Sequence, residues 1–285
     1  MKPRRLLIAG CGYVGKALAV RRLARGDEVF GLRRHPLDLP RGVVPVEADL
    51  AVRRALADLP RELDAVVYCA SPGGRDDATY RTAYVEGLRN LLGVLEEQGQ
   101  RPDRVVLTTS TGVYAQSHGE WVDEDSPTEP DHFSGRRMLE AETLLAEGPF
   151  RGIALRLAGI YGPRRTRLID RVRKGQAAIA RGAPRYTNRI HRDDCAGVLD
   201  HLLELEAPAD RYIGVDDQPE DEAVVLRFLA GAVGAPEPRV AGRGEELERR
   251  GGNKRCRNAR LVQSGYEFAY PSYREGYAAT LSELR

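Results

Sequence analysis

The feature that most constrains the fold of this chain is a glycine-rich segment between an apolar run and a helix-forming run. Residues 6–9 read LLIA, residues 10–15 read GCGYVG and residues 16–19 read KALA. Short apolar runs bounded by glycine favour strands, whereas the run after the glycines favours a helix. The order therefore predicts a strand, a tight loop and the start of a helix, which together open a parallel sheet.

Each of the three glycines in this loop has a physical reason to be glycine. Gly10 allows the tight turn, Gly12 lets the backbone approach a pyrophosphate, and Gly15 lets the helix pack closely on the strand. The first turn of the helix, with Tyr13 and Val14, offers free backbone N–H groups to an anion. We therefore expect this loop to bind the pyrophosphate of a dinucleotide. The alternative is a glycine-rich turn in an ordinary α/β protein.

The rest of the first half alternates between apolar runs and helix-like stretches. Strands are predicted at residues 6–9, 28–32, 43–47, 65–69, 105–108 and 153–157. Helices are predicted at residues 16–25, 52–59, 80–98 and 135–147. This alternation is typical of a parallel sheet that is covered by helices on both faces. We therefore predict an α/β fold, a Rossmann-type doubly wound parallel sheet with a smaller C-terminal substrate lobe.

Beyond residue 163 the alternation loosens. The sequence predicts helices at 166–181, 193–205 and 221–233, a strand at 211–215, and an exposed connector at 234–252. Residues 260–284 are expected to form a short helix, a strand at 266–270 and a closing helix. We expect a dinucleotide-binding domain over residues 1–163 and a substrate lobe over 164–285. Strands near residues 188–216 are candidates for a return to the first domain.

Composition excludes several classes of partner. The formal net charge is only +2, so nothing indicates binding to nucleic acid or to a membrane surface. No run approaches the roughly 20 apolar residues that span a bilayer, and the first residues, MKPRR, are not those of a signal peptide. The four cysteines have no metal-type spacing, so we expect no metal, reduced thiols and a cytoplasmic location. A homodimer is one candidate assembly.

The second predicted strand ends in the sequence FGLRR. In an NAD site an acid at this position holds the ribose 2′-OH, whereas here Arg33 and Arg34 suit the 2′-phosphate of NADP. We therefore expect NADP rather than NAD as the cofactor. The alternative is that both arginines are solvated surface residues.

Several segments, together with the loop, resemble the extended short-chain dehydrogenase/reductase superfamily, the group of nucleotide-sugar epimerases and dehydratases. They read ADL at 48–50, VVLTTSTGVY at 105–114, LRLAGIYGP at 155–163, NRIHRDDC at 188–195 and YIGVDD at 212–217. The resemblance runs in order over nearly the whole chain. Residues 253–277 resemble an atypical subgroup of NAD(P)-dependent epimerases.

The resemblance implies roles for five further residues. Asp49 and Leu50 would contact the adenine end of the dinucleotide, and Ala70 and Ser71 would line its cleft. Ser110 would occupy the position of the catalytic hydroxyl, where it can donate a hydrogen bond to a substrate oxygen. The alternative for Ser110 is that it merely ends a strand.

The acid/base pair of this superfamily, a tyrosine followed four residues later by lysine, is absent. Phe133 stands at the tyrosine position and Arg137 at the lysine position, and none of the four lysines has a tyrosine four residues before it. Phenylalanine cannot transfer a proton, whereas Arg137 can still hold a ribose hydroxyl although it does not give up its proton. Other candidates for proton transfer are Tyr80, Tyr84, His132 and His191.

By the same resemblance, residues after the YGP turn form the smaller lobe that holds the substrate. Asn188 and Arg189 are the predicted substrate contacts, with Arg164, Arg165 and Arg167 as alternatives. We therefore expect an NADP-dependent oxidoreductase or epimerase for a small polar substrate, which includes nucleotide-linked compounds. The alternatives are an NADP-binding sensor or regulatory protein that has lost catalysis, supported by Phe133 and Arg137, and a structural partner protein.

Overall fold

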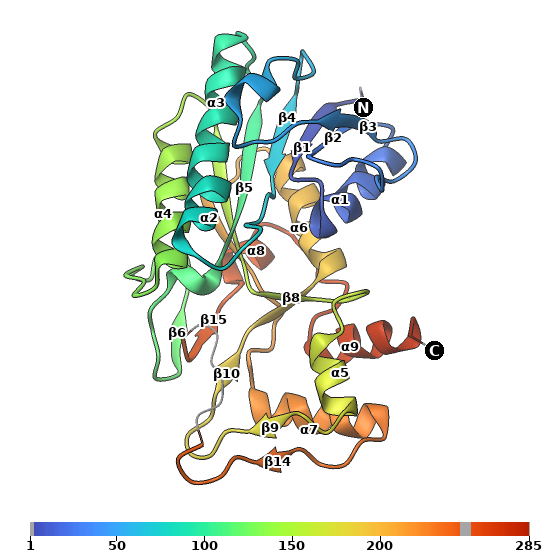
Figure 1. The fold of residues 1–285 in the computed structure, drawn as a ribbon, viewed down its shortest axis with the longest axis vertical. Helices are drawn as coiled ribbons and strands as arrows, with labels where there is room; N and C mark the ends of the chain where they lie inside the picture. The colour runs from blue at the N-terminus through green and yellow to red at the C-terminus, as the bar shows by residue number, and fades with distance from the viewer. Residues whose placement is uncertain (1–2, 246–251, 285) are drawn as a thin grey trace. The chain divides into compact units, whose positions relative to one another are not determined.

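The computed structural model of this chain describes residues 3–245 and 252–284, and Figure 1 shows the ribbon. The chain divides into two compact units, each with its own packing. The first comprises residues 1–113, 129–156 and 195–212, and the second comprises residues 114–128, 157–194 and 213–285. Both units are therefore assembled from segments that are separate in the sequence.

A seven-stranded sheet forms the centre of the Rossmann-type fold. Its strands lie in the order β12-β7-β5-β4-β1-β2-β3. The pairs β1–β2, β1–β4, β2–β3 and β4–β5 are parallel. This confirms the predicted doubly wound α/β fold. The strand bounds are β1 (Arg5–Ala9), β2 (Glu28–Arg33), β3 (Val44–Glu47), β4 (Ala65–Tyr68), β5 (Arg104–Ser110), β7 (Gly152–Leu157) and β12 (Arg211–Gly214).

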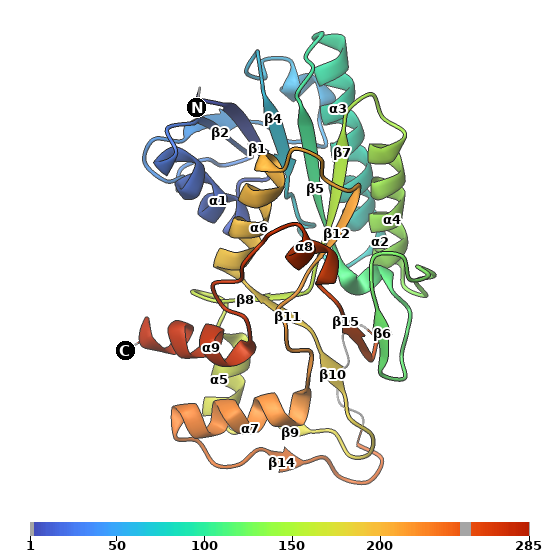
Figure 2. The same cartoon turned by 180° about the vertical axis from the view of Figure 1, so that it is seen from behind.

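Helices cover both faces of this sheet. The two opposite views show α3 (Gly87–Glu97) and α4 (Phe133–Ala146) on one face, and α1 (Tyr13–Ala24) and α6 (Arg192–Glu204) on the other (Figures 1 and 2). Ion pairs join the latter two helices, because the buried Arg22 lies 3.0 Å from Asp200 and 2.6 Å from Glu204. Apolar strands such as VVLT at 105–108 are buried between these layers.

The helix predicted over residues 80–98 is interrupted near its start. It consists of α2 (Asp77–Tyr80), a π-helical segment η2 (Arg81–Glu86) and α3. The Tyr68 hydroxyl donates a hydrogen bond to the Ala83 carbonyl, and a Cβ at Gly87 would lie 2.5 Å from that hydroxyl. A wider turn therefore accommodates the tyrosine beneath the helix. π-Helical turns of this kind are often found at functional sites.

The helix predicted at 52–59 is wrong. Only a short 3-10 turn, η1 (Arg53–Leu56), forms there, and a second such turn, η3 (Thr111–Val113), follows β5. Backbone bonds in the predicted helix run from Ala55 to Val52 and from Leu59 to Leu56, which is three-residue spacing. Because such turns have poorer hydrogen-bond geometry than α-helices, they end within a few residues.

The second unit has its own apolar core between α5 (Arg167–Arg173), α7 (Glu222–Val233) and α9 (Tyr273–Ser282). The bounds of α7 follow from its caps: Asp221 accepts a hydrogen bond from the Ala223 N–H, and Gly234 adopts φ 66° after its end. At α9, Ser272 and Glu275 form a capping box. Together these caps fix two of the helices that enclose the core.

Short two-stranded pairs complete the second unit. They are β8 (Gly159–Tyr161) with β11 (Arg189–His191), β10 (Tyr186–Thr187) with β13 (Glu220–Asp221), β9 (Ala178–Ile179) with β14 (Arg239–Val240), and β6 (Glu120–Val122) with β15 (Lys254–Cys256). A short helix, α8 (Ala259–Gln263), follows β15. Part of the predicted connector at 234–252 lies outside the described residues.

Two predicted elements of this unit need correction. The helix expected over 166–181 ends at Arg173, because Gly175 takes φ 63° and β9 follows. The strand expected at 266–270 does not form. Instead, the Asp194 carboxylate accepts hydrogen bonds from the Ala269 and Tyr270 N–H groups, at 2.8 and 3.0 Å. A side chain thus satisfies the backbone groups that a neighbouring strand would otherwise bind.

Candidate functional site

The three glycines of residues 10–15, the predicted phosphate loop, lie in different environments. Gly10 has φ +83°, and a Cβ there would lie 2.4 Å from the Ala70 backbone. A Cβ on Gly15 would lie 2.9 Å from the Ile8 side chain, so helix α1 approaches β1 closely. A Cβ on Gly12 would meet only the Gly10 carbonyl, at 3.7 Å. Gly10 and Gly15 therefore serve the fold, whereas the backbone at Gly12 faces open space.

The loop is fastened to the end of β2. The N–H groups of Gly10 and Cys11 both donate to the Leu32 carbonyl, at 3.0 and 3.1 Å. The next residue, Arg33, is half-buried and forms an ion pair with Asp38. Arg34 is exposed, and none of the described residues forms an ion pair with it. The two predicted 2′-phosphate ligands therefore follow directly after the residue that holds the loop.

The predicted residues after β3 and β4 lie at the carboxyl ends of those strands, the edge of a doubly wound sheet where ligands bind. Ala70 and Ser71 follow β4, and Ala70 contacts the phosphate loop at Gly10. Asp49 accepts the Ala51 N–H through its side chain at 3.0 Å. The Leu50 carbonyl accepts from the Asn90 side chain at 2.9 Å, which fixes the segment after β3 to α3.

Ser110 is the last residue of β5, at the same edge of the sheet. Its hydroxyl oxygen accepts the Gly112 N–H at 3.1 Å, so the O–H group remains able to donate. The start of α4 lies against this turn, because a Cβ at Gly135 would be 2.8 Å from the Gly112 carbonyl. The fold thus brings Ser110 and the first turn of α4 together.

Phe133 and Arg137 lie one turn apart on α4. The Arg137 guanidinium holds both carboxylate oxygens of Asp77, at 2.8 and 2.9 Å, and also bonds Glu140 at 2.7 Å. These two carboxylates raise the pKa of Arg137 above its ordinary value. Three of the five guanidinium N–H groups are engaged in these bonds, which leaves two for another acceptor. Arg137 therefore also anchors α2 to α4.

The candidates for proton transfer occupy four different environments. Tyr84 is buried inside the π-helical turn, and burial raises the pKa of its hydroxyl. His132 caps α4, where its ring nitrogen accepts from the Ser134 N–H at 3.3 Å. In the second unit, His191 is buried, and burial lowers the pKa of its ring to about 4.

Tyr80 differs from these three residues. It is half-buried, and its ring lies edge-on to Phe133 with the ring centroids 5.4 Å apart. None of the described residues is hydrogen-bonded to its hydroxyl. Tyr80 therefore carries a phenol beside the aromatic ring that stands at the usual tyrosine position.

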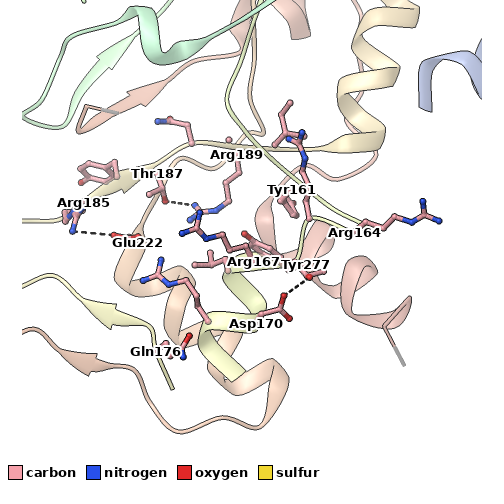
Figure 3. A pocket seen from close by; sticks show the side chains of 18 of the residues that line it. Tyr161, Arg164, Arg167, Asp170, Gln176, Arg185, Thr187, Arg189, Glu222 and Tyr277 are labelled. Atoms are coloured by element: carbon pink, nitrogen blue, oxygen red, sulfur yellow. Dashed lines mark hydrogen bonds and ion pairs between the residues drawn. The ribbon is translucent and has the colours of Figure 1, made fainter. Parts of the chain in front are cut away.

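A pocket of about 920 Å³ lies wholly within residues of the second unit (Figure 3). It is strongly basic, because its lining holds seven cationic side chains but only Asp170 and Glu222 as acids. The Asp170 carboxylate accepts from the Thr166 hydroxyl, and Glu222 lies 3.8 Å from Arg185. The cationic lining residues are Arg164, Arg165, Arg167, Arg171, Lys174, Arg185 and Arg189.

The two predicted substrate contacts, Asn188 and Arg189, both line this pocket, but their side chains are engaged differently. Asn188 donates to the Lys254 carbonyl at 2.9 Å and accepts the Cys256 N–H at 2.7 Å, so it fastens β15 in place. Arg189 is 8% exposed and bonds the Thr187 hydroxyl. No carboxylate among the described residues lies within ion-pair distance of Arg189, so its charge is available to an anion.

Behind Arg189, the second unit contains a buried acid. Asp216 is 2% exposed, and one of its carboxylate oxygens accepts from the Gln218 N–H at 3.2 Å. The other oxygen has no hydrogen-bond partner among the described residues. Burial raises the pKa of Asp216 to about 8, although the positive charge of Arg189 acts in the opposite direction.

Sequence reasoning missed several charged residues that the structure brings into these regions. Asp38 lies five residues after Arg33 and is paired with it. Asp77 is the first residue of α2, the helix that ends at the proton-transfer candidate Tyr80, and it is paired with Arg137. Arg171, Lys174 and Arg185 join the predicted arginines in the pocket lining. The repeated basic residues between 164 and 174 were the available signal. No spacing rule links Arg137 with an acid 60 positions earlier.

The comparisons with known proteins agree with this fold. The NAD dependent epimerase/dehydratase family profile matches residues 6–208, and the chain belongs to that family. A 3-diazoavenalumate denitrifying reductase from Streptomyces is 30% identical over 257 residues, which cover 83% of this chain and 84% of the reductase. The NAD-dependent epimerase/dehydratase-like protein of Methylobacillus flagellatus is 40% identical, with a TM-score of 0.82 and 99% of each chain covered.

A more distant solved structure shows the fold alone. Human epimerase family protein SDR39U1, solved with NADPH, is 20% identical to this chain, with a TM-score of 0.79. The alignment covers 98% of this chain and all of the human one. Membership of the NAD dependent epimerase/dehydratase family, which the resemblance predicted, rests on the family profile. Within the described residues, no helix combines the length and apolar character that crossing a membrane requires.

Proposed function

We propose that this protein is an NADP(H)-dependent oxidoreductase or epimerase of the extended short-chain type, acting on a small polar substrate that carries negative charge. One observation carries the cofactor part of the proposal. The phosphate loop is hydrogen-bonded to Leu32, and the next two residues are Arg33 and Arg34 rather than an acid. Paired arginines suit a 2′-phosphate because a guanidinium can bind two of its oxygens at once.

The proposed chemistry is hydride transfer. A nicotinamide cofactor, when bound, supplies or accepts the hydride, and the protein contributes binding, orientation and proton transfer. The Streptomyces relative is named a reductase, which favours net reduction over epimerisation for this chain as well. Ser110 is the proposed donor to the substrate oxygen, because its hydrogen is not used by the bond from Gly112.

Tyr80 is the residue that we propose for proton transfer. Of the four candidates, it is the one whose side chain is neither buried nor used to cap a helix, and its ring lies against Phe133. A positioned tyrosine can act as a general acid or base within hydrogen-bond reach of the substrate. The bidentate bond from Arg137 to Asp77 holds the helix that ends at Tyr80, which gives Arg137 a positioning role. Its two remaining N–H groups would bond a ribose hydroxyl.

The basic pocket supports an anionic substrate. A buried guanidinium without a carboxylate partner is costly unless a ligand supplies the negative charge. Arg189 is in this situation, and six further cationic residues line the same pocket. A phosphate or carboxylate group on the substrate would supply that charge, and nucleotide-linked compounds fall in this class. Asn188 would contribute by shaping the pocket wall.

The test of the proposed function has two parts. NADPH and NADH are titrated by calorimetry at one ionic strength, and NADPH oxidation is followed with a panel of ketones, acidic aldehydes and nucleotide sugars. Tighter binding of NADPH, with turnover of at least one anionic substrate, is the expected result. Equal affinities, or a preference for NADH, would contradict the cofactor assignment.

The second candidate function is an NADP-binding sensor or regulatory protein without catalysis. Phe133 in place of a tyrosine and the engagement of Arg137 by two carboxylates favour it. Tight NADPH binding without turnover of any compound in the panel would select this candidate.

We also propose a cytoplasmic location, which fits the four free cysteines, and a homodimer in solution. Light scattering of the purified protein measures the assembly state.

A further inference from the structure

An acid that the cofactor assignment does not use lies beside the phosphate loop. Asp38, in the segment after β2, accepts hydrogen bonds through one carboxylate oxygen from Lys16 and through the other from Arg33. Lys16 belongs to the first turns of α1, and Arg33 is the last residue of β2. One carboxylate therefore bridges a cation of α1 and a cation at the end of β2.

These three charges lie close to the loop itself. The pKa of the Cys11 thiol, inside the loop, is raised to about 11 chiefly by burial. The positive charges of Arg33 and Lys16 lower the pKa of that thiol, and the negative charge of Asp38 raises it. Because Cys11 and Gly10 are bonded to Leu32, this end of β2 cannot move away from the loop without breaking two hydrogen bonds.

The chemistry of the two cofactors differs at this point. The 2′-phosphate of NADP needs arginine, whereas the 2′-hydroxyl of NAD is held by a carboxylate. In this structure Arg33 already has a carboxylate partner, and that partner is 64% exposed on its side chain. A 2′-phosphate reaching Arg33 would compete with Asp38 and be repelled by it. A 2′-hydroxyl could instead donate to Asp38.

We propose that Asp38 is a specificity-determining residue that competes with the 2′-phosphate for Arg33 and so narrows the preference for NADPH over NADH. The inference rests on the proposed NADP(H) site. Arg34 is exposed and has no carboxylate partner among the described residues, so it supplies the basal preference for the 2′-phosphate. The protein would consequently accept both cofactors, with a moderate rather than an absolute preference.

The test is the Asp38→Asn variant of the full chain, titrated with NADPH, NADH, 2′,5′-ADP and 5′-AMP at one ionic strength. Exposed ion pairs are weak, so the expected gain in affinity for NADPH and 2′,5′-ADP is about two- to fivefold. Affinity for NADH and 5′-AMP should stay equal or fall. A loss of NADPH affinity would show that Asp38 orients Arg33 for the phosphate and would overturn the inference, as would unchanged affinities.

Two further variants separate this effect from a general change of charge. Glu28→Gln removes an exposed acid that is paired with Arg5 at the opposite end of β2, and it should leave all four affinities unchanged. In an Arg33→Ala background, Asp38→Asn should improve NADPH binding less than in the wild type, because only the repulsion of the phosphate is then relieved, and an undiminished gain would contradict the competition for Arg33.

The Asp38→Asn test measures binding affinities only, so its result does not depend on whether the protein catalyses a reaction. If wild-type protein binds NADPH but turns over no substrate, the proposed enzymatic function fails while the Asp38 comparison still decides the inference. If wild-type protein binds NADPH more tightly than NADH and Asp38→Asn leaves that ratio unchanged, the inference alone is overturned. Absence of binding of every probe to the wild type would overturn both.

Discussion

The phosphate loop of the first unit and the basic pocket of the second unit are built in different ways. The loop is six consecutive residues, and the proposed site there depends on their backbone conformation and N–H groups. The pocket is lined by side chains from residues 159–176, 185–189, 222, 252–253 and 277. A backbone site leaves a compact sequence signature, whereas a side-chain site assembled from distant segments leaves only a bias toward arginine. The two regions therefore respond differently to mutation.

The largest expected effect comes from filling the open side of the loop. Gly12→Val should weaken NADPH binding by about 100-fold or more, because its side chain would occupy the space of the pyrophosphate. The fold should survive, since a Cβ there meets nothing nearer than the Gly10 carbonyl at 3.7 Å. Calorimetric titration together with far-UV circular dichroism measures both properties. Retained binding would mean that the loop is not the pyrophosphate site.

The neighbouring glycine provides the contrasting variant. Gly10→Ala should destabilise the first unit itself, because Gly10 has φ +83° and a Cβ would lie 2.4 Å from the Ala70 backbone. A lower unfolding midpoint in urea is therefore expected for Gly10→Ala but not for Gly12→Val. Equal midpoints for the two variants would contradict the division of roles within the loop.

The next effect concerns proton transfer in the first unit. Tyr80→Phe should lower kcat by about 100-fold on any substrate that the wild type turns over, since general acid–base catalysis contributes 10²–10⁴-fold. The affinity for NADPH should not change. Tyr84→Phe is the matched control, because that hydroxyl is buried and its raised pKa keeps it protonated. A Tyr80→Phe enzyme with wild-type kcat would assign the proton to another group.

A smaller effect is expected in the basic pocket. With the phosphate loop saturated by NADPH, Arg189→Ala should weaken the binding of inorganic pyrophosphate by about tenfold, because a charge-assisted hydrogen bond is lost from a site with other cations. NADPH binding should be unaffected. The control is Arg227→Ala, an exposed arginine of α7 that is paired with Glu237. If both variants bind pyrophosphate equally well, non-specific attraction by the basic lining explains the binding.

The smallest expected effect is a slope of stability with pH. The pKa of Asp216 in the folded protein is about 8, above the ordinary value of 3.8. Between these values the folded carboxyl keeps a proton that the unfolded one has lost. As the pH rises, the free energy of unfolding of the wild type should therefore fall, relative to that of Asp216→Asn, by about 1 kcal/mol per pH unit.

Urea unfolding at pH 6.5, 7.0 and 7.5 measures this difference. Both proteins contain His191, so its lowered pKa contributes equally to the two profiles and cancels from the difference. Parallel pH profiles for the wild type and Asp216→Asn would show that Asp216 is ionised in the folded protein.

The fold could be predicted from the sequence because its signals are local. Alternating strands and helices, and glycines at fixed offsets, indicated the doubly wound sheet and the tight turn between its first strand and first helix. The strand expected at 266–270 failed because its alternating aromatic pattern resembles a strand, whereas Asp194, more than 70 positions earlier, binds its backbone. Local pattern cannot reveal such a partner.

The candidate site could be predicted only in part for the same reason. Arg33, Arg34 and Ser110 follow motif positions, so their places at strand ends were foreseeable. The pairing of Asp38 with both Arg33 and Lys16, and of Asp77 with Arg137, depends on how loops return to the site. No residue spacing encodes these pairs, because each acid approaches its partner across separate elements of the fold.

The return of residues 195–212 to the first unit has a consequence for how the protein is made. On α1, Arg22 is 2% exposed, and two of its acid partners, Asp200 and Glu204, are translated 178 and 182 residues after it. Until the ribosome has passed that point, the first unit lacks both these acids and β12. A nascent chain ending near residue 163 already contains residues 10–15 and the ion pair of Arg22 with Asp27, yet it lacks the two acids of α6 that complete the pairing of this guanidinium. The first unit is therefore completed late in synthesis, after most of the chain has emerged.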